Sequence, residues 1–230
     1  MVKCILCQNQ SKKVNADVYK CLICKTHFYP KYKEVQFDYT KEYETTYPGL
    51  QEYCQNLIDP FYEVSKRGQP YAGVFNILKK ANPDMSVLDV GCGYGYTTWA
   101  MRNAGLKATG IDISETSINF AKKTFGGNYF CEDIQKYAER KVKHDLVVAI
   151  EVFEHLSYPK EFIKSCMEVS NTLILTTPNL DSAYLQDWFS DKPPLHQACY
   201  RLSSMKYIAK EFKLRFHGLL GENIIAIFTK

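Results

Sequence analysis

From residue 71 onward, hydrophobic residues fall into short runs, and segments with helical spacing separate these runs. Runs such as 146–150, apolar on both faces, predict strands buried within a sheet. Apolar positions recurring every three or four residues predict helices between them. The predicted strands cover 87–90, 108–111, 128–131, 146–150, 172–176, 214–219 and 223–228. The predicted helices cover 71–80, 97–104, 115–124, 134–139 and 159–169.

Alternating strands and helices are typical of an α/β fold whose strands run parallel. The last two predicted strands are separated only by Gly218–Glu222, which indicates an antiparallel hairpin at the sheet edge. The pattern therefore predicts a Rossmann-like, seven-stranded and mostly parallel sheet, with helices on both faces and an antiparallel C-terminal edge.

Two different segments precede this predicted domain, 71–230. Residues 1–30 alternate polar stretches with Cys-x-x-Cys corners and end at Pro30. Residues 31–70 are rich in tyrosine and are predicted to be a helical lid or connector, with helices over 50–57 and 61–66. The sequence thus predicts three parts.

Two cysteine pairs, Cys4 with Cys7 and Cys21 with Cys24, have the spacing of a zinc ribbon. A short segment of this kind takes much of its folding free energy from the metal. We therefore expect a structural Zn²⁺ ion bound by four thiolates. With no apolar leader at the N-terminus, the chain's 9 cysteines do not indicate a disulfide framework, and we expect a cytoplasmic protein.

The overall composition excludes several classes of protein. Hydrophobic residues make up 46% and charged residues 23%, which is ordinary for a globular chain. The apolar runs are too short to span a bilayer, so no membrane partner is expected. A net charge of +4 is too small to indicate a partner. The lysine-rich N-terminal segment has two readings: a solvated surface, or a site for an anionic partner such as RNA.

A glycine turn follows the first predicted strand of the sheet. Gly91, Gly93 and Gly95 alternate with other residues immediately before a predicted helix. Glycine permits a tight turn and a close approach of backbone to a ligand. The NAD fingerprint G-x-G-x-x-G requires its third glycine where this chain has Tyr96, so the spacing argues against a dinucleotide.

Segment 89–95 resembles motif I of class I methyltransferases that depend on S-adenosylmethionine (SAM), and further matches follow in order. They are 110–114, 132–134, 145–156 and 173–179. The resemblance covers about residues 71–230. It is closest to the small-molecule branch, which includes ubiquinone-biosynthesis O-methyltransferases and enzymes of polysaccharide and natural-product pathways.

The resemblance implies a SAM-binding site at the ends of the predicted strands. The glycine loop would hold the methionine end of SAM, braced by Asp89. Asp112 would accept hydrogen bonds from the ribose hydroxyls; its other reading, a helix N-cap, suits Ser114 better. The remaining residues assigned to the cofactor are Ile113 packed on adenine, Asp133 and the backbone of Ile134 at the adenine edge, and Glu151 facing the crevice.

Transfer to an oxygen acceptor also requires a base, and two histidines are candidates. His155 follows the fourth predicted strand, and His196 lies in the long segment after the fifth. Each has an alternative reading, His155 as a turn residue and His196 as a loop residue. His27, His144 and His217 are interpreted as structural or surface residues.

Tyr39 and Tyr43 are four residues apart and would share one face of a helical turn. Related sugar-pathway methyltransferases have tyrosine-rich lids, which implies that these two could cover the sulfonium of SAM. Packing of the N-terminal segment onto the sheet is the other interpretation.

The sequence therefore predicts SAM-dependent methyl transfer to a small molecule, with sugars or sugar nucleotides among the candidates and oxygen favoured over nitrogen or carbon. One alternative is an RNA methyltransferase, because ribosomal-RNA guanine methyltransferases also join a zinc motif to this fold. Their zinc set ends in histidine, whereas this chain has four cysteines. A second alternative is an inactive SAM-binding scaffold. The oligomeric state is not predicted.

Overall fold

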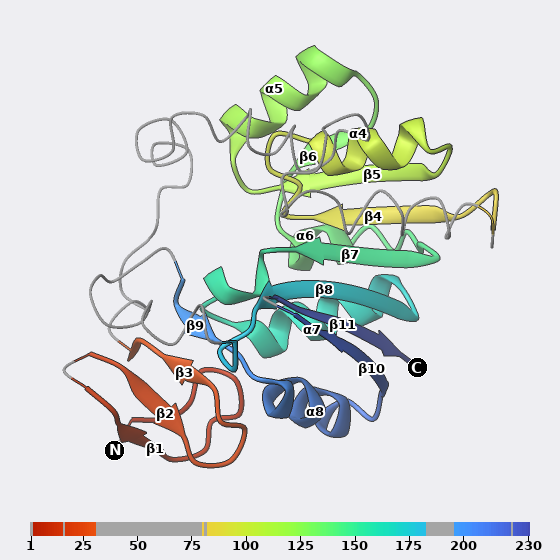
Figure 1. Ribbon diagram of the computed structural model, residues 1–230. Helices are drawn as coiled ribbons and strands as arrows, with labels where there is room; N and C mark the ends of the chain where they lie inside the picture. Colours follow the sequence, from red (N-terminus) through yellow and green to blue (C-terminus); the bar gives the residue numbers. More distant parts are fainter. Residues whose placement is uncertain (1, 16, 31–79, 81, 183–195, 222) are drawn as a thin grey trace. The chain divides into compact units, whose positions relative to one another are not determined.

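The computed structural model describes residues 2–15, 17–30, 80, 82–182, 196–221 and 223–230 (Figure 1). The helices predicted over 50–57 and 61–66 lie outside this part of the chain, as does the one over 71–80 apart from Lys80. The chain forms two compact units. Unit 1 comprises Met1–Gln36 and Ala149–Lys230, and unit 2 comprises Phe37–Val148.

Unit 2 follows the predicted alternation of strands and helices. Its elements are β4 (Ser86–Val90), α4 (Tyr96–Asn103), β5 (Lys107–Asp112), α5 (Glu115–Phe125), β6 (Tyr129–Cys131) and α6 (Ile134–Ala138), and β7 (Leu146–Ile150) crosses into unit 1. Strand β4 pairs in parallel with β5 and β7, and β5 pairs in parallel with β6. These strands run parallel because each helix returns the chain to the same end of the sheet.

Unit 1 contains the remaining elements. They are η2 (Phe153–His155), α7 (Pro159–Val169), β8 (Thr172–Pro178), β9 (Ala198–Cys199), α8 (Leu202–Glu211), β10 (Arg215–Leu220) and β11 (Asn223–Thr229), together with the N-terminal strands β1 (Ser11–Lys13), β2 (Tyr19–Cys21) and β3 (His27–Phe28). None of the described helices is long and apolar enough to cross a membrane.

The described strands form two sheets. The larger has seven strands in the order β10-β11-β8-β7-β4-β5-β6. Strands β10 and β11 form the predicted antiparallel hairpin, and β11 also pairs antiparallel with β8. The Rossmann-like α/β sheet predicted from the sequence is therefore confirmed.

The smaller sheet has four strands in the order β1-β2-β3-β9 (Figure 1). Its first three strands come from the N-terminal segment, but β9 comes from the C-terminal part of unit 1. The hydrophobic pattern does not predict β9, which is only two residues long and is formed by its pairing with β3.

Helix α8 is also absent from the predicted elements. Its buried side chains, Met205, Ile208 and Ala209, are spaced for one helical face. A capping box closes its N-terminus, in which the Ser204 hydroxyl accepts a hydrogen bond from the Arg201 amide at 3.2 Å. Three apolar positions in a polar segment are a weak sequence signal, so packing decides that this helix forms.

Candidate functional site

The loop between β4 and α4 turns at three glycines. The φ angles of Gly91, Gly93 and Gly95 are 73°, 51° and 83°, where residues with a Cβ are strained. A Cβ at Gly95 would lie 2.7 Å from Ala121 Cβ and 2.8 Å from Tyr129 Cε1. A Cβ at Gly93 would meet none of the described atoms within 4 Å. Packing thus requires glycine at 95, whereas at 93 no described atom occupies the place of a side chain.

Asp112 ends β5 and holds this loop in place. Its side chain is buried, and its Oδ2 accepts a hydrogen bond from the Gly93 amide at 2.8 Å. Its Oδ1 accepts one from the Ser114 amide, also at 2.8 Å. Burial raises the pKa of this carboxyl group, and these two hydrogen bonds oppose the rise. Since each carboxylate oxygen can accept two hydrogen bonds, Asp112 retains capacity for a ligand hydroxyl.

Helix α5 is capped by Ser114, as expected. The Ser114 hydroxyl accepts a hydrogen bond from the Ser117 amide at 3.2 Å. The Asp112 carboxylate is thereby left to the glycine loop and to the amide of Ser114.

Asp89 connects β4 to α4. It is fully buried, and its Oδ2 accepts a hydrogen bond of 2.6 Å from the Thr98 hydroxyl in α4. Burial raises its pKa to about 7, because the charged form loses its hydration. Asp89 thus fixes the helix that follows the glycine loop.

The residues after β5 and β6 differ in what they can offer a ligand. Ile113 is 56% exposed, so its apolar side chain is available for contact with a ligand. Ile134 is 2% exposed, so its side chain belongs to the core and only its backbone remains for recognition. Asp133 is exposed and caps α6, with its Oδ1 accepting a hydrogen bond from the Lys136 amide at 2.7 Å.

Glu151 follows directly on β7, which is parallel to β4. Ligands of open α/β sheets bind at such carboxyl ends of strands. The Glu151 Oε1 accepts hydrogen bonds from the Thr176 hydroxyl at 2.7 Å and from Asn223 Nδ2 at 3.1 Å. Burial raises the pKa of this carboxyl group. With a backbone φ of 54°, Glu151 is held in a conformation rare for residues with side chains.

The two histidines predicted as bases lie together in unit 1. His155 belongs to η2 and His196 precedes β9, yet their ring centroids are 4.8 Å apart. Glu154 joins them: its Oε1 lies 3.9 Å from His155 Nε2 and 4.0 Å from His196 Nε2. The structure therefore brings residues from distant segments into one carboxyl–imidazole cluster.

Burial favours the neutral forms of Glu154 and His196 in this cluster. Burial, followed by the nearby charge of Glu151, raises the pKa of the Glu154 carboxyl well above its ordinary value. Burial and then His155 lower the pKa of His196 to about 3. A neutral imidazole has a lone pair that can accept a proton, and the lowered pKa makes His196 a weaker base than an ordinary histidine. One carboxylate and two imidazoles are also a donor set that divalent transition metals accept.

Sequence reasoning does not single out Glu154, although segment 145–156 contains it. The available signal was an acid beside a histidine immediately after a buried strand. Only the fold shows that this side chain is fully buried, whereas the preceding acid, Glu151, is engaged by Thr176 and Asn223.

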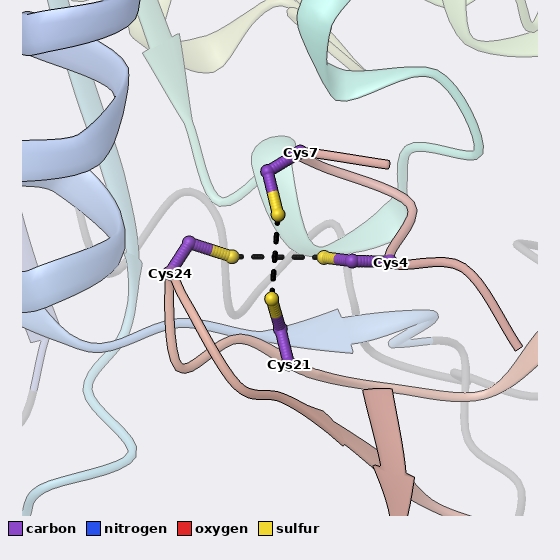
Figure 2. A group of neighbouring side chains, drawn as sticks. All are labelled: Cys4, Cys7, Cys21 and Cys24. Carbon is purple, nitrogen blue, oxygen red and sulfur yellow. Dashed lines mark hydrogen bonds between the residues drawn. The ribbon is translucent and has the colours of Figure 1, made fainter. Parts of the chain in front are cut away.

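The four N-terminal cysteines converge on one point. Figure 2 shows the side chains of Cys4, Cys7, Cys21 and Cys24 directed toward one another. All four are buried, and their sulfur atoms lie within 4.8 Å of one another.

Two corners of matching backbone geometry present these sulfurs. The Cys4 amide donates to Asn9 O at 2.9 Å, and the Cys21 amide donates to Thr26 O, also at 2.9 Å. Each corner contains a left-handed residue just after its second cysteine, Gln8 with φ 59° and Lys25 with φ 64°. The corners are thus equivalent, as expected for two halves of one metal site.

The spacing of the sulfur atoms fits a tetrahedral metal ion. Bonds of about 2.3 Å from zinc imply sulfur separations of about 3.8 Å. The Cys4 and Cys24 sulfurs are 3.6 Å apart, and those of Cys7 and Cys21 are 3.3 Å apart. The hydrogen bond to Cys24, followed by burial, raises the pKa of the Cys4 thiol. Four buried thiols this close together do not all ionise unless a cation compensates their charge. Zn²⁺ supplies that positive charge, so the donor set suits it.

The other predicted residues are placed as follows. Tyr39 and Tyr43 lie outside the described residues. His144 has a structural role, because its Nε2 and the Tyr137 hydroxyl are hydrogen-bonded at 2.8 Å. His27 lies in β3 and His217 in the exposed edge strand β10.

Comparison with known proteins connects this geometry to a family. The family model described as "Methyltransferase domain" matches residues 65–216. A ubiquinone biosynthesis O-methyltransferase of Coxiella burnetii is 36% identical over 85 residues, which are 35% of this chain and 36% of that protein. A protein of the same name from Idiomarina loihiensis is 31% identical over 137 residues, covering 49% and 56% of the two chains.

The chain thus spans about a third to a half of the length of these curated relatives. Among solved structures, the magnesium protoporphyrin IX methyltransferase of Synechocystis, with bound SAH, has a TM-score of 0.59 and 17% identity. That likeness covers 83% of this chain and 98% of the other. At this identity the match shows a shared fold.

Proposed function

Because the chain belongs to the family of methyltransferase domains, we propose that it binds SAM and transfers the methyl group to an oxygen atom of a small molecule. SAM supplies a methyl group already activated by its positively charged sulfur. The observation that carries the proposal is the left-handed glycine loop joined to the buried carboxylate of Asp112 by the 2.8 Å hydrogen bond from Gly93.

In this proposal the residues of unit 2 bind the cofactor. The open backbone at Gly93 receives the amino-acid part of SAM, and Asp112 accepts hydrogen bonds from the ribose hydroxyls. The exposed side chain of Ile113 covers one face of the adenine ring, where it would lose contact with water. Asp133 and the backbone of Ile134 recognise the adenine edge.

Glu151, which directly follows β7, is the remaining residue proposed to contact SAM. Its carboxylate is already engaged by Thr176 and Asn223, so it is not proposed to transfer a proton.

The cluster of Glu154, His155 and His196 supplies the proton acceptor. An alcohol must lose its proton as its oxygen attacks the methyl group, and a neutral imidazole can take that proton. Such general-base assistance contributes about 10²–10⁴-fold. His155 and His196 are therefore the proposed catalytic pair, and sugars or sugar nucleotides are the proposed acceptors. The curated relatives named as O-methyltransferases support oxygen as the acceptor atom.

The four cysteines are proposed to hold a structural Zn²⁺ ion. Their burial and the two equivalent corners support this role. Redox chemistry would require accessible sulfur atoms, whereas these are buried. The proposed location is the cytoplasm, where reducing conditions keep paired cysteines available to a metal.

The test combines binding with transfer. Calorimetry should show saturable binding of S-adenosylhomocysteine (SAH), the demethylated product, and Asp112→Ala should weaken it. Labelled methyl groups from SAM should then appear in the small-molecule fraction of a cell extract. Absence of SAH binding overturns the proposal. Label found only in RNA, with affinity falling steeply as salt is added, assigns the chain to RNA instead. SAH binding without transfer to either pool identifies a scaffold.

A further inference from the structure

We propose that the N-terminal cysteine module, residues 2–30, positions the catalytic pair by holding strand β9 next to His196. This inference rests on the proposed function. In this proposal the module acts on residues of its own unit and not by binding a nucleic acid. The supporting contacts all lie within unit 1.

The first connection is between backbones. Strand β3 of the module pairs antiparallel with β9, with His27 opposite Cys199 and Phe28 opposite Ala198. The pairing extends one step further, since the Tyr29 amide donates to Gln197 O at 3.0 Å. Gln197 is the neighbour of His196 in the chain. The module therefore fixes the backbone immediately after the histidine.

The second connection links a cysteine corner to helix α8. The Ser204 hydroxyl donates to the carbonyl oxygen of Cys24 at 3.0 Å, and the Thr26 hydroxyl donates to Ser204 Oγ at 3.2 Å. The Cys24 sulfur lies 3.1 Å from the same Thr26 oxygen. The side chains of Thr26 and Ser204 are fully buried, so these contacts are shielded from water. They therefore help to hold the module against α8.

The residues that flank β9 contact the turn that carries His155. The Tyr200 hydroxyl donates to Phe153 O at 3.3 Å, and the centroids of the two aromatic rings are 4.6 Å apart. The Ser157 hydroxyl donates to Gln197 Oε1 at 2.8 Å. Segment 197–200 thus lies between the cysteine module and η2, so its position determines how His196 meets Glu154 and His155.

A metal ion bound by the four cysteines would stabilise this arrangement. A segment as short as the module buries too little apolar surface to fold alone, so metal binding would supply much of its folding free energy. When the metal is removed, β3 no longer holds its conformation and β9 loses its strand partner. His196 then moves away from His155, although the SAM-binding residues of unit 2 are unchanged.

Hydrogen exchange on the full zinc-loaded chain tests this coupling. Zinc is removed with a chelator, and its release is measured with a dye. Exchange of residues 197–201 should become at least about tenfold faster, because local opening now exposes these amides. Exchange in β4 and β5 should stay the same. Unchanged exchange at 197–201, or equally faster exchange in β4 and β5, overturns the proposal.

A variant that keeps the cysteines separates positioning from general stability. Ser204→Ala should retain zinc, speed exchange at 197–201 and lower kcat, while the affinity for SAH stays within about twofold. Ser204→Thr restores the hydroxyl and should recover kcat. Leu22→Ala, a change at an exposed side chain of the module, is the matched control and should alter nothing.

A Ser204→Ala variant with normal kcat and normal exchange contradicts the proposal. If the wild-type chain binds no SAH, the proposed function fails, while the exchange measurement still reports whether the module holds β9. The two failures are therefore distinguishable.

Discussion

The hydroxyl group of Tyr129 donates a hydrogen bond of 3.0 Å to the carbonyl oxygen of Gly95. This contact places the tyrosine ring where a Cβ at Gly95 would lie. Arg102 Nη2 in turn donates to the tyrosine oxygen at 3.1 Å, which links α4, β6 and the glycine loop. The last glycine of the loop is thus surrounded by neighbours as well as constrained by its backbone.

Gly95→Ala should therefore destabilise the chain more than its backbone conformation alone requires. We expect a loss of about 2–4 kcal/mol in the free energy of unfolding, from left-handed strain and overpacking together. Urea denaturation of Gly95→Ala measures the loss, and a loss no larger than the about 1–2 kcal/mol of backbone strain would show that Tyr129 yields to the extra methyl group.

Asp112→Asn should weaken SAH binding by about 10–100-fold, because it removes a charge-assisted acceptor from the ribose site. Asp84→Asn is the matched control: Asp84 is an exposed acid of unit 2 paired with Lys107 at 2.9 Å. Calorimetry on both variants should find the loss only at Asp112. An unchanged affinity for the Asp112 variant would move the ribose site elsewhere.

Asp89 should make stability depend on pH. Its folded-state pKa of about 7 lies above the ordinary 3.8, so the folded chain keeps a proton that the unfolded chain releases. The stability that this retained proton contributes is fully present below about pH 4. It is lost as pH rises through about 7, by up to about 4 kcal/mol in the free energy of unfolding. Asp89→Asn removes this dependence.

Urea denaturation at pH 4.5 and pH 7.5 measures this effect, and the difference between variant and wild type isolates Asp89 from other buried acids. The variant should gain stability relative to the wild type at the higher pH. The same difference at both pH values would mean that Asp89 does not hold its proton.

His155→Ala and His196→Ala should each reduce methyl transfer by about 10²–10⁴-fold while SAH still binds. The double variant should lose little more than the larger single loss, since the two residues act as one unit. His217→Ala, a change in β10, serves as the control. Normal turnover of either variant would exclude that histidine as the base.

The purified chain should contain about one zinc ion per protein molecule by elemental analysis. Cys21→Ser should lose the metal and much of the stability of the module, because one of four ligands is gone. Cys131→Ser is the matched control, as Cys131 is exposed and lies in β6. A metal content near zero in the wild-type chain would show that the cysteines bind none.

The predicted strand 146–150 and helix 159–169 have the same bounds in the structure, and most others differ by one or two residues. Their signals are local: a run of buried apolar residues, or a proline at the start of a helix with a regular apolar face. Strand β9 has no such signal, because its partner β3 lies far away in the chain.

The pattern of residues along the chain was enough to specify the parallel sheet, the glycine turn, the antiparallel edge and the cysteine spacing, because each depends on neighbours within a few positions. Tertiary packing alone decided that the N-terminal module shares a sheet with β9, and that His155 and His196 meet at Glu154. Contacts between distant segments depend on how buried surfaces fit in three dimensions. Short-range periodicity in the sequence does not predict that fit.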